Sequence, residues 1–166
     1  MTPEDGTGIP GADSLVSAEV ALELALARGV ELDDDEDVLG PLLVQATDWI
    51  VAHWTWPRSS RLTSTQGLPW PRYGAYDANG DLLAGVPQPV ELAVVLLAIE
   101  AVNGALDPNP TEAGVLKEFT EQTGPLMEKR VWLSPQASGR RFPQVERLLQ
   151  ITGGVRAGSM REAVRG

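Results

Sequence analysis

Apolar residues recur at three- and four-residue steps in the first third of the chain, and this period predicts an amphipathic helix. The stripe consists of Leu39, Leu42, Leu43, Ala46, Trp49, Ile50, His53 and Trp54. Pro41 fits such a helix only near its first turn, and Trp56-Pro57 is expected to end it. On this stripe, His53 is expected to be a core or inter-subunit hydrogen-bonding group rather than a base or a ligand.

A shorter helix is predicted ahead of this one. Ser17 is a suitable N-cap, Glu19 favours the positive end of the helix dipole, and Gly29 supplies a stop. Residues 1–16 are rich in Gly, Pro, Asp and Thr, and we expect them to form an extended N-terminal arm.

A third helix is expected to open at residues 86–89 and to run to about Ala105. From residue 90 to residue 102 only Glu91 and Glu100 are polar, so this helix is apolar on nearly every side. Such a helix is normally buried on all faces. In a chain this short a neighbouring subunit would complete the burial, which is a first indication of an oligomer.

The last third of the chain predicts a β-ribbon and a short helix. Residues 115–133 are expected to form two strands joined near Gly124-Pro125, and Phe142-Pro143 opens a helix that Gly153-Gly154 ends. The predicted fold is mainly α: a small helical bundle with a long packed loop, a β-ribbon, an extended N-terminal arm and a C-terminal tail. The expected divisions are an arm over 1–16, a helical domain over 17–152 that includes the ribbon, and a C-terminal docking tail over 153–166.

Residues 57–86 form a long connection that is rich in Gly and Pro. Such a connection is usually functional or packed on itself, and Trp70 and Tyr73 are suited to hold it down. Aromatic and arginine residues lie close together in two segments, Trp54-Thr55-Trp56-Pro57-Arg58 and Trp70-Pro71-Arg72-Tyr73. This composition suits stacking on single-stranded DNA as well as a hydrophobic clamp, and the clamp is the preferred interpretation.

Two acidic segments have a superficial similarity to calcium loops. Residues 31–37 lack the glycine and the distant glutamate of an EF-hand, so a solvated helix start is the preferred interpretation. Residues 77–81 lack the downstream glutamate, and Asn79-Gly80 predicts a tight turn there.

Composition excludes several kinds of site. The 166 residues suit one domain, and the absence of cysteine with a single histidine excludes disulfides, thiolate metal sites and multi-histidine metal cages. The chain has no GxxxxGK[ST] loop and no GxSxG elbow, and residues 6–11 match GxGxxG without the strand that should precede it. We expect no catalytic residue, cofactor or metal. The longest apolar run, residues 92–99, is too short to span a membrane, so no membrane contact is expected.

The net charge of −10 is unevenly distributed. Residues 1–56 hold twelve acidic residues and one basic residue, whereas residues 57–166 hold eleven acidic and twelve basic residues. Whole-protein acidity argues against a dedicated nucleic-acid binder. The acidic first third and the more basic remainder favour contacts between surfaces of opposite charge, including those of neighbouring copies of the chain. An equally good interpretation is that the charged residues of each part are simply solvated.

The order of several short motifs carries a resemblance over about residues 4–150. The motifs are Ala27-Arg28-Gly29, Ala46-Thr47-Asp48, Thr65-Gln66, Trp70-Pro71-Arg72, Pro87-Gln88 and Gly124-Pro125. In this order the chain resembles the head–tail adaptor (connector) proteins of tailed bacteriophages, which often carry the label DnaT-like single-stranded-DNA-binding protein.

The resemblance implies a structural virion protein and not an enzyme. Such adaptors assemble as a ring, typically of twelve copies, beneath the portal protein, and the ring extends the DNA channel toward the stopper or tail-completion protein. The chain is then expected in the neck of a tailed phage, assembled in the host cytoplasm, with double-stranded DNA passing without specific binding. Acidic or mixed channel walls suit this role because they do not hold phosphates. The label implies the alternative, a replication protein that binds single-stranded DNA.

Three groups of residues are candidates for contacts in such a ring. The long loop is expected to be held, against the helices or another subunit, by Trp49, Trp54, Trp70 and Arg72, with an acidic neighbour for the arginine. The channel or its rim is expected to include Asp33, Asp34, Asp35 and Glu36. The portal is expected to be contacted by Arg156, Met160, Arg161 and Arg165, unless the tail is disordered. An enzyme that binds a metal through residues 33–37 is the least favoured hypothesis.

Overall fold

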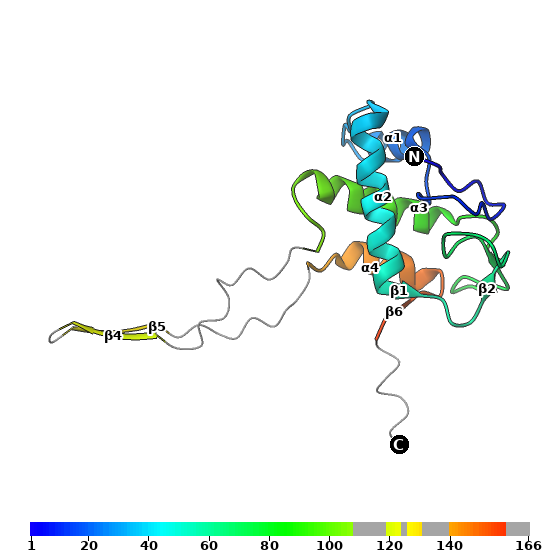
Figure 1. Ribbon diagram of the computed structural model, residues 1–166. Coiled ribbons are helices and arrows are strands. Elements are labelled where there is room, and N and C mark those ends of the chain that lie inside the picture. The colour runs from blue at the N-terminus through cyan, green and yellow to red at the C-terminus, as the bar shows by residue number, and fades with distance from the viewer. Residues whose placement is uncertain (108–118, 124–125, 131–139, 159–166) are drawn as a thin grey trace, which may run out of the picture. The chain divides into compact units, whose positions relative to one another are not determined.

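The computed structural model describes residues 1–107, 119–123, 126–130 and 140–158 (Figure 1). The helices are α1 (Ala18–Leu26), α2 (Glu36–His53), α3 (Gln88–Val102) and α4 (Pro143–Ile151). The strands are β1 (Trp54–Thr55), β2 (Ser60–Arg61), β3 (Arg72–Tyr73), β4 (Phe119–Thr123), β5 (Leu126–Arg130) and β6 (Val155–Arg156). They pair as β1 with β6, β2 with β3 and β4 with β5, all antiparallel. The expected mainly α fold with a small ribbon is confirmed.

The chain divides into two compact units. The helical unit comprises Met1–Gly104 with Phe142–Gly166, and the ribbon unit comprises Ala105–Arg141. In the ribbon unit β4 and β5 form a two-stranded sheet in which Thr123 faces Leu126. The two strands predicted on either side of Gly124-Pro125 are therefore present.

Local signals set the helix starts as predicted, whereas α2 ends at His53, before the predicted stop at Trp56-Pro57, because Trp54 and Thr55 form β1. The Ser17 hydroxyl accepts a hydrogen bond from the Val20 amide at 3.3 Å and caps α1. The Asp35 carboxylate accepts one from the Asp37 amide at 2.9 Å and caps α2. Pro41 is the sixth residue of α2 and lies inside the helix, so the hydrogen bond that an amide at this position would donate to the Asp37 carbonyl is missing.

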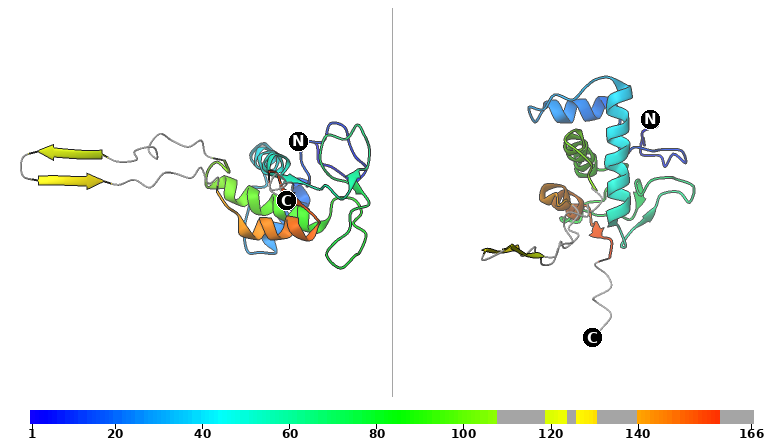
Figure 2. Two further views of the ribbon diagram at one scale, coloured as in Figure 1. Left: turned by 90° about the horizontal axis from the view of Figure 1, so that it is seen from below. Right: turned by 60° about the vertical axis from the view of Figure 1, so that its left-hand side comes forward.

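Much of the third helix is buried by its own chain. Helix α3 packs against α1, α2 and α4, and it lies alongside α4 (Figure 2). These helices cover the side chains of Val90, Ala93, Val94, Val95, Leu97 and Ala98. Leu92, Leu96 and Ile99 remain half-buried and Val102 is 60% exposed, so the expectation that a neighbouring subunit completes the burial stays a prediction.

The first 16 residues are irregular but closely packed on the helical unit. Leu15 and Val16 are buried, and the Glu4 amide donates to the Ser14 carbonyl at 2.8 Å. The carboxylate of Glu4 is itself buried, and it accepts hydrogen bonds from the amides of Gly8 at 2.8 Å and Ile9 at 2.9 Å. A buried carboxylate requires such partners. Glu4 therefore holds the opening turn of the chain in place.

The predicted tail begins inside the helical unit. Strand β6 pairs with β1, so that Arg156 faces Trp54, and the Ala157 amide donates to the His53 carbonyl at 2.7 Å. The Arg156 side chain forms an ion pair with Glu146 of α4 at 3.1 Å. The other residues of the portal-contact hypothesis, Met160, Arg161 and Arg165, lie outside the described residues.

Candidate nucleic-acid interface

Two tryptophans hold the long loop against the helical unit. Trp70 has no exposed surface, and its ring meets that of Trp56 edge to face, with centroids 5.8 Å apart. Trp56 is anchored in turn, because its indole Nε1–H donates to the Thr152 hydroxyl at 3.1 Å, just after α4. The clamp interpretation of these two segments therefore fits the structure, although Trp56 was noted only within its segment and not among the four residues expected to hold the loop.

Arg72 lies under the loop and binds backbone rather than the acidic neighbour that the sequence suggested. Its Nε–H donates to the Ser59 hydroxyl at 2.7 Å. Its Nη atoms donate to the carbonyls of Pro69 and Trp56, each at 2.9 Å, and to the carbonyl of Ser59. Burial lowers the pKa of Arg72, and the charge of Arg61 lowers it further. The guanidinium thus ties together two turns of the loop that are distant in sequence.

Gln66 is a second internal tie, which the sequence analysis quoted only as part of a motif. Its side chain is buried, and its Nε2 donates to the carbonyls of Leu68 at 2.9 Å and Pro71 at 3.0 Å. Its Oε1 accepts from the Thr63 amide at 2.9 Å. Buried polar groups are nearly always hydrogen-bonded, so a buried glutamine is expected to bind neighbouring backbone groups. The sequence signal for this role was the presence of a glutamine within a connection rich in Gly and Pro.

The other two predicted clamp residues act elsewhere. Trp49 stacks on His53, with centroids 4.4 Å apart, and meets Phe142 edge to face at 5.4 Å. It therefore holds α4 rather than the loop. Trp54 is buried in β1, opposite β6. His53 is half-buried, and its Nδ1 lies 2.8 Å from the Trp49 carbonyl, as expected of a structural hydrogen-bonding group.

The outer surface of the loop is aromatic and basic. The side chains of Tyr73 and Tyr76 are 73% and 56% exposed. Arg58 and Arg61 are also exposed, whereas Arg72 is half-buried. The β2–β3 pairing places Tyr73 opposite Ser60 and Arg61 opposite Arg72. The loop therefore buries its tryptophans and presents its tyrosines.

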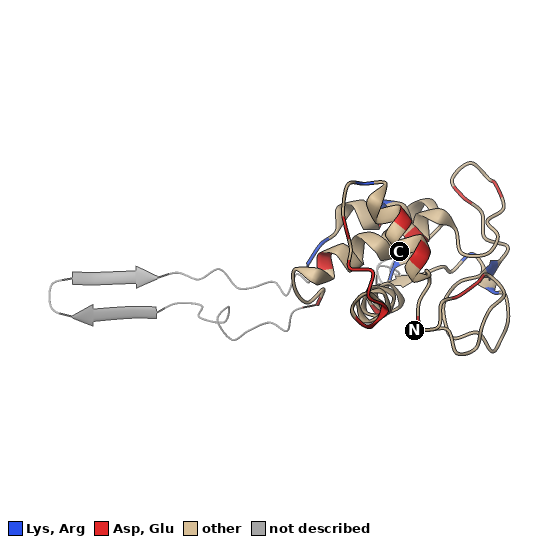
Figure 3. Ribbon diagram, turned by 90° about the horizontal axis from the view of Figure 1, so that it is seen from above, with Lys and Arg blue, Asp and Glu red and all other residues tan. Residues whose placement is uncertain are grey.

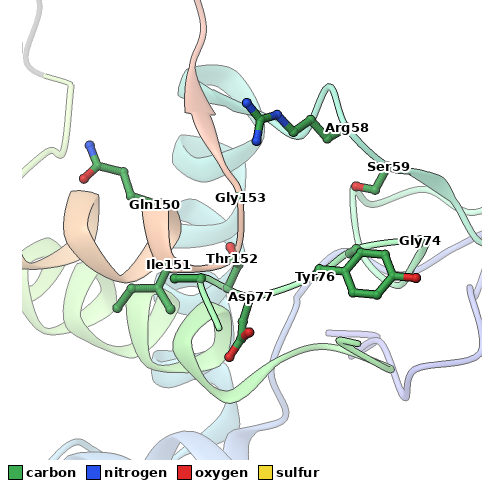
Figure 4. A pocket seen from close by; sticks show the side chains of 11 residues that line it. Arg58, Ser59, Gly74, Tyr76, Asp77, Gln150, Ile151, Thr152 and Gly153 are labelled. Atoms are coloured by element: carbon green, nitrogen blue, oxygen red, sulfur yellow. The ribbon is translucent and has the colours of Figure 1, made fainter. Parts of the chain in front are cut away.

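Two neighbouring hollows open on this surface. The polar hollow, of about 370 Å³, is lined by residues that include Arg58, Ser59, Tyr76, Asp77, Gln150 and Thr152 (Figure 4). The apolar hollow, of about 410 Å³, is lined by residues that include Leu62, Pro71, Arg72, Tyr73, Tyr76 and Leu82. Both include Gly74 and Tyr76, so the two hollows adjoin at this tyrosine.

The acidic residues of segment 31–37 are all exposed, and Figure 3 shows Asp and Glu in red where this segment leads into α2. The Asp33 carboxylate accepts from the Asp35 amide at 3.0 Å, Asp35 caps the helix, and Glu36 lies in its first turn. These interactions agree with a solvated helix start, since carboxylates are favourable at a helix N-terminus.

Among the residues that the structure describes, no group of three or more acidic or histidine side chains could hold a metal ion. Within the same residues no helix is long and apolar enough to cross a membrane.

Comparison with known proteins identifies one family. The family described as "Putative DnaT-like ssDNA binding protein" matches residues 1–166. No curated protein and no solved structure matches the chain. The head–tail adaptor assignment therefore gains no support from these comparisons, and the match agrees better with the single-stranded-DNA alternative. Since the match extends over the whole chain, the protein belongs to the DnaT-like ssDNA binding family.

Proposed function

We propose that the chain binds single-stranded DNA on the outer surface of the loop between α2 and α3. The observation that carries this proposal is the exposure of Tyr73 and Tyr76 on a loop that also exposes Arg58 and Arg61. Bases stack on exposed aromatic rings while phosphates interact with nearby cations, which is the usual mode of binding to a single strand. The description of the family supports the same function.

The local charge of the loop favours this surface over the rest of the molecule. Between α2 and α3, residues 54–87 hold three arginines and two aspartates, Asp77 and Asp81, so this loop is slightly basic although the net charge of the chain is −10. The phosphates of a DNA strand are therefore attracted by the arginines of the loop and repelled by the acidic segment 31–37. Binding is expected to be weak and to decrease steeply with salt, with a slope of about −0.7 per phosphate contact.

Fluorescence anisotropy with a labelled oligothymidine of about 16 nucleotides tests the proposal. Affinity measured from about 50 to 200 mM salt gives the slope. Arg58→Gln should weaken binding and reduce the magnitude of the slope by about 0.7. The matched control is Arg28→Gln, which removes an equal charge at the end of α1 and should affect binding much less. Equal effects of the two substitutions, or no binding by the unaltered chain, would contradict the proposal.

A second candidate function is the subunit of a head–tail adaptor ring, with the portal and stopper proteins as partners. The specific observation in its favour is the exposed acidic surface of Asp33, Asp34, Asp35 and Glu36. A carboxylate surface of this kind repels phosphates, as the wall of a DNA channel requires.

Imaging of tailed virions tests this second candidate. The adaptor function predicts a ring of this chain between capsid and tail, and negligible affinity for the oligonucleotide. Virions without the chain, combined with salt-dependent binding to the oligonucleotide, would leave only the first function.

A further inference from the structure

We propose that Tyr76 separates two adjacent nucleotide subsites, so that one nucleotide of the strand occupies the polar hollow and the next occupies the apolar hollow. The inference rests on the proposed binding of single-stranded DNA and adds the path of the strand and the place where base identity is recognised. It follows from the position of Tyr76, which lines both hollows.

The backbone holds Tyr76 firmly at this boundary. Tyr76 forms an antiparallel bridge with Leu82, and the Leu83 amide donates to the Ala75 carbonyl at 2.9 Å. The tight turn that follows is closed by the Asp77 carboxylate, which accepts from the Asp81 amide at 2.8 Å. The exposed ring is therefore carried on an ordered turn, and it can insert between two successive bases with little loss of backbone entropy.

The polar hollow is suited to hold a base together with its phosphate. Figure 4 shows Arg58 and Ser59 on one side of it and Gln150 with Ile151 on the other. Its volume of about 370 Å³ lies within the range of small-molecule pockets, roughly 300–1,000 Å³. The Arg58 guanidinium is placed to neutralise a phosphate. Gln150 is exposed and offers both a donor and an acceptor to the edge of a base.

Other polar residues of this hollow already have internal partners. The Thr152 hydroxyl accepts from the Trp56 indole and donates to the Leu149 carbonyl at 2.8 Å. The Asp77 carboxylate is held by amides of its own turn. Gln150 is therefore the side chain assigned to base readout in the polar hollow.

The apolar hollow should accept any base. Leu62, Leu82 and Tyr73 expose apolar surface there, with exposed fractions of 46%, 64% and 73%. The guanidinium of Arg72, the basic residue that contributes to this hollow, is directed to backbone carbonyls beneath the loop. Stacking on such a surface tolerates every base because each has a π-face. The nucleotide in the polar hollow is therefore recognised by its base, whereas the neighbouring nucleotide in the apolar hollow is bound whatever its base.

The test compares the affinities of four homo-oligonucleotides for the full chain and for the variants Tyr76→Ala, Tyr76→Phe and Gln150→Ala. Tyr76→Ala should weaken binding to all four by roughly five- to 150-fold, and Tyr76→Phe should bind almost normally because the ring is retained. Gln150→Ala should bring the four affinities to within about twofold of one another. Circular dichroism should show unchanged folding, since both side chains are largely exposed.

The possible failures are distinguishable. If the unaltered chain binds no oligonucleotide, the proposed function fails and this inference fails with it. If the chain binds but Tyr76→Ala has the same affinity, the proposed function stands and the two-subsite path is wrong. If the four affinities are already equal in the unaltered chain, or stay unequal in Gln150→Ala, base readout by Gln150 is wrong.

Discussion

Replacing Trp70 by alanine is the most direct test of how the long loop is held. The indole has no exposed surface, packs edge to face on Trp56, and lies beside the carbonyls that Gln66 binds. Truncation therefore removes a large buried apolar surface and leaves a cavity that the surrounding turns cannot easily fill. Comparable substitutions lower the free energy of unfolding by about 3–5 kcal/mol.

For a chain of this length, that loss corresponds to a decrease of about 6–20 °C in the melting temperature. Urea and thermal unfolding followed by far-ultraviolet circular dichroism measure it without depending on tryptophan fluorescence. Tyr73→Ala is the matched control, because this aromatic side chain is 73% exposed and should change stability by less than about 0.5 kcal/mol. A Trp70→Ala protein with unchanged melting would refute the clamp.

Three further substitutions probe other parts of the helical unit. Gln66→Leu leaves the buried carbonyls of Leu68 and Pro71 without their donor and should cost about 1–3 kcal/mol in urea unfolding, whereas the exposed Gln45→Leu should not. Burial raises the pKa of Glu91, so its charge opposes folding at neutral pH; Glu91→Gln should stabilise the protein at about pH 7, and the gain should vanish as the pH falls through the raised pKa. A gain that persists in acid would contradict this assignment. Glu146→Gln removes the ion pair with Arg156, which is partly exposed, and should cost no more than about 1 kcal/mol, measured as a shift of the urea midpoint that high salt abolishes.

The sequence predicted the elements whose signals are local. The cap at Ser17, the proline in the first half of α2 and the two strands on either side of Gly124-Pro125 each depend on neighbouring residues, and the structure has each of them. It did not predict which aromatic residues would be buried together. Trp56 and Trp70 are far apart in the chain, and their contact depends on the path of the loop rather than on periodicity.

The candidate interface was only half predicted for the same reason. Both aromatic and arginine-bearing segments were noted, but the sequence cannot show that their tryptophans face inward while Tyr73 faces outward. Gln150 gave no local signal, since it comes to line the same hollow as Tyr76 only in the folded chain. The apolar length of α3 suggested an external partner because its internal partners are separated from it in the sequence.

The ends of the ribbon unit have a consequence for how this protein can vary. The Arg140 side chain donates to the Ala105 carbonyl at 3.4 Å, so the two ends of the ribbon unit lie close together. Everything between these residues is an insertion into a bundle whose helices α3 and α4 pack directly on each other. We therefore expect the helical unit to keep its core when this insertion is lengthened, shortened or exchanged, because the contact between α3 and α4 does not depend on it.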